Sequence, residues 1–237
     1  MDVLYKYKFN ILCGIFLFLL SFCGCFMVLL RWLYTEQIQF LFLIKNLFLA
    51  WIPYGLSVII VFLYGYTAGK LKKIAMFILG IAWLLFFPNA PYMLTDFIHY
   101  RGNLSFIMWY DLVIYALFIF NGFLLGFVSI YYIYRIIEKE INILVGWLFV
   151  LFVLFLSGYG IYLGRFIRWN SWDILFRPME LINSAIEHIN IFSIIFSLIF
   201  GTLLTLTYAF LYILTFLSRE KIGEWAIKMP GWLESWG

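Results

Sequence analysis

The run FNILCGIFLFLLSFCGCFMVLL, residues 9–30, decides the fold class of this chain. A helix needs ~20 consecutive apolar residues to cross a hydrocarbon core of ~30 Å. The run is too long for the apolar core of a signal peptide, and no small-residue cleavage site follows it. Strands of a membrane barrel alternate lipid-facing and lumen-facing residues, whereas residues 11–20 are apolar on every side. We therefore predict that this run is a retained membrane-spanning helix.

The composition extends this prediction to the whole chain. Of 237 residues, 66% are hydrophobic and only 12% are charged, against roughly 45–50% and about 25% in a soluble domain. A water-soluble fold of this size could not bury so much apolar surface. We predict one all-α transmembrane domain over residues 1–237. The predicted spans are residues 9–30, 46–66, 74–90, 109–132, 141–163 and 191–217, with interfacial segments at 172–189 and 219–236.

The distribution of lysine and arginine predicts the orientation. Ten of these residues fall in the N-terminal segment, the second and fourth loops and the C-terminal segment. The other three loops hold five, or six with Lys45. The positive-inside rule then places both termini in the cytoplasm and the first, third and fifth loops outside. We expect a multi-pass membrane protein.

The formal net charge of +4 does not point to nucleic acid, because the basic residues form short clusters beside apolar runs. The expected partners are membrane lipids, including an anionic lipid or lipid-linked headgroup. Another membrane protein is the alternative partner, and no nucleic-acid partner is expected.

This topology gathers unusual polar residues at one membrane face. They follow a proline-broken turn in the third loop, begin the fourth span and end the fifth span. The candidate site residues are Asn89, Tyr92, Asp96, His99, Asp111, Arg165, Arg168, Asn170 and Asp173.

Spacing within this set indicates two kinds of chemistry. Asp96 and His99 are three residues apart, so one helical turn would place a carboxylate beside an imidazole, which suits general acid–base catalysis. Arg165 and Arg168 are also three apart, and two guanidinium groups suit the capture of phosphate or carboxylate. Together these residues would hold a lipid phosphate or a lipid-linked substrate.

Structural roles explain the same residues without any site. Arg165 and Arg168 would then contact phospholipid headgroups or pair with Asp96, Asp111 or Asp173. The pair of Asp96 and His99 would be structural in that case. No metal site is predicted, because one histidine with scattered carboxylates does not supply three ligands, and no cofactor is expected.

Other polar and small residues within the spans predict packing. Asn46 and Asn121 are expected to form interhelical hydrogen bonds. Gly160 and Gly164 have the small-xxx-small spacing of closely packed helices. Near the proline-broken turn, Asn89 is expected to cap the helical turn that follows it.

Several motifs resemble a known family. They are NLFLAWIP at 46–53, PNAPY at 88–92 with Thr95, Asp96 and His99, WYDL at 109–112, GIYLGR at 160–165 and RWNSWD at 168–173. These resemble the bacterial integral membrane family known as domain-of-unknown-function family 1361, over about residues 40–215. The resemblance implies a multi-span inner or plasma membrane protein, and it supplies no reaction.

The sequence favours an envelope-associated binding or accessory protein with an outward-facing polar site for an anionic headgroup or a partner. One alternative is a membrane-embedded enzyme acting on lipid or lipid-linked substrate, with His99 as acid/base and Asp96 orienting it. A small transporter ranks third, because transport favours ionisable residues near mid-membrane and this chain has few there. The sequence leaves open whether the chain catalyses a reaction.

Overall fold

The protein is a bundle of long apolar helices, as predicted. The computed structural model describes residues 2–66, 69–99 and 106–228. Within these residues there is no strand, and six helical segments are long and apolar enough to cross a membrane. Those segments are Ile11–Thr35, Leu41–Gly65, Lys70–Ile98, Ile107–Glu140, Ile143–Ile167 and Ile191–Thr215. The all-α transmembrane fold class is therefore confirmed.

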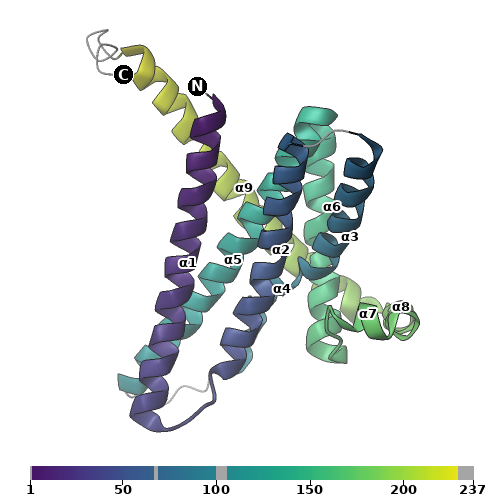
Figure 1. The fold of residues 1–237 in the computed structure, drawn as a ribbon. Helices are drawn as coiled ribbons and strands as arrows, with labels where there is room; N and C mark the ends of the chain where they lie inside the picture. The colour runs from purple at the N-terminus through teal and green to yellow at the C-terminus, as the bar shows by residue number, and fades with distance from the viewer. Residues whose placement is uncertain (1, 67–68, 100–105, 229–237) are drawn as a thin grey trace.

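The order of the elements explains why two sets of loops lie at opposite ends of the bundle. In chain order they are α1 (Asp2–Thr35), α2 (Leu41–Tyr66), α3 (Lys70–Phe86), α4 (Asn89–Tyr92), the 3₁₀ helix η1 (Met93–His99), α5 (Phe106–Glu140), α6 (Ile143–Tyr162), the π-helix η2 (Leu163–Ile167), α7 (Asp173–Phe176), α8 (Pro178–Glu187) and α9 (Ile191–Lys228). Successive spans alternate in direction, so α1 begins and α9 ends at the same end (Figure 1). We call the opposite end, which holds residues 36–40 and 168–172, the polar end.

Helix α5 holds the bundle together. It contacts α1, α2, α4 and α6, whereas α9 packs mainly along α6. One core cluster lies where α1, α2 and α5 meet, around Leu43 and Phe118. A second joins α3, α5, α6 and α9 around Trp83, whose indole N–H donates to the Ser129 hydroxyl at 2.7 Å. Many large apolar side chains on the outside of the spans are exposed, which suits a surface that faces lipid instead of water.

A polar contact within the spans links three helices. The Ser21 hydroxyl of α1 accepts hydrogen bonds from the Trp51 indole of α2 at 3.0 Å and from the Asn121 amide of α5 at 2.7 Å. It donates to the carbonyl of Leu17 at 2.8 Å. The expected interhelical role of Asn121 is confirmed, and the contact ties α1 to the rest of the bundle.

The third membrane segment is kinked between α3 and α4. Pro88 lacks an amide donor and stands between the two helices, in right-handed helical conformation. The expectation that Asn89 caps α4 is wrong, because the N-cap residue is Pro88 and α4 has no side-chain cap. The Asn89 amide instead donates to the carbonyl of Phe86 at 2.9 Å, so it satisfies the end of α3.

Four glycines of α5, α6 and η2 pack against the kinked segment. We call them the glycine cradle: Gly122, Gly126, Gly160 and Gly164. A Cβ atom at Gly122 would lie 2.6 Å from the carbonyl oxygen of Ala90, and one at Gly160 would lie 2.8 Å from the Pro88 ring. The predicted close packing at Gly160 is therefore confirmed. The kinked segment packs this closely against its neighbours only because the facing positions carry no side chain.

The segment predicted to be interfacial at 172–189 forms the short helices α7 and α8 beside the polar end (Figure 1). The Trp169 indole donates to the Ser184 hydroxyl of α8 at 2.9 Å. Met179 and Ile182 of α8 are exposed. In the other predicted interfacial segment, residues 219–228 continue α9, and residues 229–236 lie outside the described part of the chain.

Candidate functional site

A buried ion pair lies where α2, η1 and η2 meet at the polar end. Asp96 is only 1% exposed, and one of its oxygens lies 2.6 Å from Nη2 of Arg165. Its other oxygen accepts a hydrogen bond from the Asn46 amide at 2.6 Å. The guanidinium also donates to the Thr95 hydroxyl at 2.6 and 3.0 Å and lies 4.5 Å from the Tyr92 ring centroid. Charge-assisted hydrogen bonds of this kind fix both partners.

The backbone around Arg165 departs from a regular helix. Helix α6 widens into the π-helix η2, and the left-handed conformation of Arg168, with φ of 69°, ends it. Non-glycine residues rarely adopt positive φ, and π-turns are frequent at functional sites. An α-helix would place Arg165 and Arg168 on one face. Here Arg165 is folded against Asp96, whereas the side chain of Arg168 is exposed.

A polar pocket lies beside this ion pair. Its cavity of about 80 Å³ is enclosed by α2, α3–α4, α6 with η2, and residues 169–171. The polar residues that line it are Lys45, Asn46, Asn89, Tyr92, Asn170 and Ser171. Pockets for drug-sized ligands measure roughly 300–1,000 Å³, so this one suits part of a molecule, such as a headgroup.

Lys45 brings a positive charge to the pocket that no carboxylate balances. Its side chain is exposed, and its ammonium nitrogen lies 5.0 Å from the ring centroid of Trp172. Among the described residues, no carboxylate lies within ion-pair distance of Lys45 or of Arg168. Arg168 does not line the pocket. The pocket therefore has one uncompensated cation in its wall.

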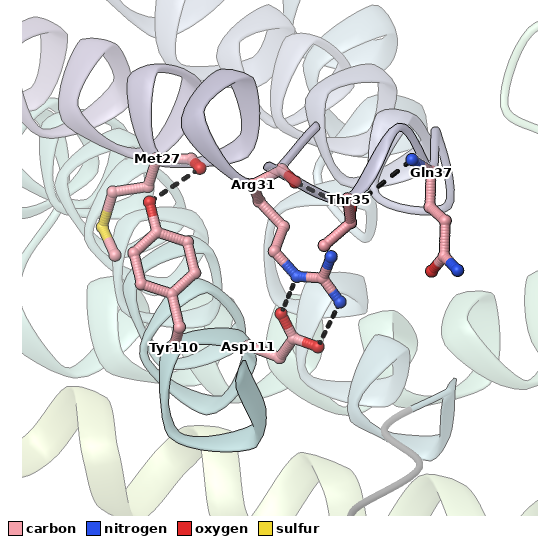
Figure 2. Close-up of polar contacts among 6 residues, drawn as sticks. All are labelled: Met27, Arg31, Thr35, Gln37, Tyr110 and Asp111. Carbon is pink, nitrogen blue, oxygen red and sulfur yellow. Dashed lines mark hydrogen bonds and ion pairs between the residues drawn. The ribbon is translucent and has the colours of Figure 1, made fainter. Parts of the chain in front are cut away.

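Asp111 takes part in a separate contact between α1 and α5. Figure 2 shows its carboxylate held by one edge of the Arg31 guanidinium. The Nε–Oδ1 and Nη2–Oδ2 distances are 2.6 and 3.1 Å. The Arg31 and Asp111 side chains are 7% and 16% exposed. Nearby, the Tyr110 hydroxyl donates to the carbonyl of Met27 at 2.9 Å. We call this contact the α1–α5 clasp, and Asp111 does not line the pocket.

Asp173 stabilises the turn that carries the pocket residues Asn170 and Ser171. Its Oδ2 accepts a hydrogen bond from the backbone N–H of Asn170 at 2.8 Å, and its Oδ1 lies 3.3 Å from Arg177. The Asn170 N–H, together with the Arg177 guanidinium, holds the pKa of the Asp173 carboxyl below its usual value. Asp173 therefore positions the loop without lining the cavity.

The predicted acid–base pair is described only in part. His99 is the last residue of η1, and its side chain lies outside the described part of the structure. Both oxygens of Asp96 have partners, Arg165 and Asn46. No group of three or more His, Cys, Asp or Glu residues that could hold a metal ion occurs among the described residues.

Three of the nine predicted site residues line the pocket: Asn89, Tyr92 and Asn170. Sequence reasoning missed Lys45, Asn46 and Ser171 as lining residues. From the sequence, Lys45 counts among the loop cations, and Asn46 is expected to form an interhelical hydrogen bond. Their position in the first turns of α2, at the polar end, is the signal that joins them to the site. The interhelical hydrogen bond expected of Asn46 is confirmed by its contact with Asp96.

The comparisons with known proteins identify a family. No curated protein and no solved structure matches this chain. A family model described as "Protein of unknown function (DUF1361)" matches residues 45–207, which is more than half of the chain. This range contains the pocket, the buried pair of Asp96 and Arg165, and α8, whereas Arg31 of the α1–α5 clasp precedes it. The chain, with its six long apolar helices, therefore belongs to the DUF1361 family.

Proposed function

We propose that this protein is an envelope-associated binding or accessory protein of a bacterial plasma (inner) membrane. Its outward-facing polar end binds the anionic headgroup of a lipid or lipid-linked molecule. The observation that carries this proposal is the uncompensated ammonium of Lys45 in the wall of a small polar pocket.

Local charge pairing supports an anionic ligand. The three aspartates of the predicted site are each engaged by an arginine: Asp96 by Arg165, Asp111 by Arg31 and Asp173 by Arg177. These pairs contribute little net charge beside the pocket. Lys45 is the cation left over among the lining residues, and it would attract an anion that enters the pocket.

The position of the pocket supports a headgroup as the source of that anion. The pocket lies near the polar ends of α2 and α6, where spanning helices leave the hydrocarbon region and meet headgroups. The exposed apolar residues Met179 and Ile182 of neighbouring α8 suit contact with the same membrane surface. A molecule anchored in the leaflet would therefore present its headgroup at the right level.

The hydrogen bonds of Asp96 give this carboxylate a structural role. Both oxygens of Asp96 already accept from protein groups, one from a guanidinium and one from an amide. This arrangement suits a carboxylate that holds three helices in place.

The proposal is tested by measuring lipid binding to the purified full-length chain in detergent. Native mass spectrometry would compare phosphatidylglycerol, which is anionic, with phosphatidylcholine, which is not. We expect preferential binding of phosphatidylglycerol and a weakening of about tenfold in Lys45→Gln, because hydrogen bonds to charged groups contribute about 1.5–3 kcal/mol.

The matched control is Lys73→Gln. Lys73 is an exposed lysine in the first turn of α3, at the end of the bundle opposite the pocket. It should leave the preference for phosphatidylglycerol unchanged. If the two variants bind phosphatidylglycerol equally well, there is no anion-binding site at Lys45.

A further inference from the structure

We infer that the ligand of this pocket is a polyol phosphate, an anionic phosphate whose neighbouring group carries free hydroxyls, and not a bare phosphate. This inference rests on the proposed function and names the ligand class within it. It follows from the hydrogen-bonding groups that the lining residues leave available.

Asn89 offers the ligand only its carbonyl oxygen. Both N–H groups of its amide are used, one by the carbonyl of Phe86 and one by the hydroxyl of Ser171, each at 2.9 Å. A backbone carbonyl can only accept, so the orientation of this amide is fixed by its partner. The acceptor Oδ1 of Asn89 is the group left for a ligand.

Two further lining asparagines are oriented in the same sense. The amide nitrogen of Asn46 donates to a carboxylate oxygen of Asp96 at 2.6 Å. The amide nitrogen of Asn170 approaches Asp173 at the longer distance of 3.5 Å. An ionised carboxylate accepts only, so each amide must direct N–H toward it. The carbonyl oxygen and the second N–H of each amide have no hydrogen-bond partner among the described residues, so each of these two asparagines adds an acceptor and a donor.

Donors are present beside these acceptors. The Ser171 hydroxyl accepts from Asn89, so its own proton remains available to a ligand. The phenol of Tyr92 makes no hydrogen bond to another described residue and can donate as well as accept. Hydroxyl groups on a ligand both donate and accept, so they match this mixed set. A bare phosphate offers almost only acceptors and would leave the asparagine oxygens facing its own negative oxygens.

The positive charge of Lys45 favours a ligand whose hydrogen-bond donors are hydroxyls over one whose donor is an ammonium group. An ammonium would satisfy the amide oxygens, but it would lie beside the uncompensated cation of Lys45, and like charges repel. Neutral hydroxyls avoid that repulsion and leave Lys45 to the phosphate. Glycerol phosphates and sugar phosphates share this chemistry.

The test compares lipids that differ in hydroxyls, again with the full-length chain in detergent. Phosphatidylglycerol carries a phosphate with two free hydroxyls, whereas phosphatidic acid carries the phosphate alone. We expect phosphatidylglycerol to bind about tenfold more tightly, although phosphatidic acid has the more highly charged phosphate. Equal binding, or tighter binding of phosphatidic acid, would overturn the inference.

Two variants test which residues are responsible for the preference for a ligand with free hydroxyls. Asn170→Ala and Ser171→Ala should reduce phosphatidylglycerol binding to the level of phosphatidic acid, with phosphatidic acid binding unchanged. Asn170 is exposed and its backbone N–H still holds Asp173, so this variant should fold, as thermal unfolding would verify. The control is Thr207→Ala, an exposed hydroxyl on α9 that bonds within its own helix. If both variants keep the preference for phosphatidylglycerol, the pocket amides and hydroxyls do not select hydroxyls.

A competition arm distinguishes the sources of the ligand. Displacement of the lipid by soluble glycerol 3-phosphate supports the inference with a free polyol phosphate as a sufficient ligand, whereas selective lipid binding without displacement supports it with a lipid-anchored ligand. The outcomes also separate the two proposals. If binding depends on Lys45 but is the same for lipids with and without free hydroxyls, the proposed function stands and this inference is rejected. If Lys45→Gln leaves lipid binding unchanged, the proposed function itself is rejected.

Discussion

Replacing Arg165 by methionine should destabilise the protein far more than an ordinary loss of an ion pair. The partner carboxylate of Asp96 is 1% exposed, and the Arg165 side chain is 16% exposed. Methionine keeps the length of the side chain but leaves the carboxylate with the Asn46 amide and without its cation. Removing one partner of a buried pair costs about 3–5 kcal/mol, because the remaining charge stays out of water. We expect a loss of that size in the free energy of unfolding.

The measurement is reversible unfolding in mixed micelles, with rising sodium dodecyl sulfate and circular dichroism as the probe. The matched control is Arg135→Met. Arg135 pairs with Glu138 one helical turn away, but its side chain is 45% exposed. Exposed pairs contribute about 0.2–1 kcal/mol, so the control should change little. Equal losses in the two variants would refute the argument from burial.

A second variant identifies the cause. Asp96→Asn in the Arg165→Met background removes the stranded charge and keeps the shape of the side chain. The double variant should therefore be more stable than Arg165→Met alone, and the two effects should not add. If the double variant is less stable by the sum of the single losses, the cost does not come from an uncompensated charge.

Three other predictions address packing, pH and topology. Gly122→Ala would place a methyl group 2.6 Å from a main-chain oxygen of α4 and should lower the free energy of unfolding by about 1–3 kcal/mol. The control Gly55→Ala, which has no neighbour within 4 Å, should be neutral or slightly stabilising. Equal unfolding free energies of the two variants in mixed micelles would show that the glycine cradle is not tightly packed. Because the pKa of Asp173 is lowered in the folded state, its contribution to stability is complete above the unfolded-state pKa of about 4 and is lost as pH falls through the folded-state pKa. Asp173→Asn should therefore reduce the change in thermal stability between neutral and acid pH. An unchanged pH dependence would contradict this. In a background without native cysteines, a membrane-impermeant thiol reagent added to intact cells should label Arg168→Cys and not Lys73→Cys, and the reverse pattern would invert the predicted orientation.

Hydropathy carried most of the fold prediction, because lipid-facing helices are apolar on all sides and nothing else in the chain competes with that signal. The six predicted spans correspond to six long helical segments. The ends differ where polar residues continue a helix: α2 begins at Leu41, ahead of the predicted Asn46. The kink at Pro88 also follows from the sequence, since proline removes a donor wherever it stands.

The candidate site was predictable only in its location. Residue spacing assumed α-helical geometry, so Arg165 and Arg168 were expected on one face, and the change to a π-turn at Leu163 has no signal in a single sequence. The ion-pair partner of each carboxylate could not be predicted from the sequence either. Asp111 could pair with several arginines, and only the packing of α1 on α5 selects Arg31. The position of Lys45 in the first turns of α2 places it at the polar end, but its proximity to the other lining residues depends on how α2 packs against the rest of the bundle.

The glycine cradle determines which parts of this chain can tolerate sequence change. Most of the bundle's outer surface carries apolar side chains suited to lipid, and there one apolar residue can replace another with little effect on stability. At Gly122 and Gly160 an added methyl group would enter space that the kinked segment already fills. The placement of the pocket-lining turn is thus encoded by residues that contribute no side chain of their own, and added hydrophobicity elsewhere in the membrane could not replace them.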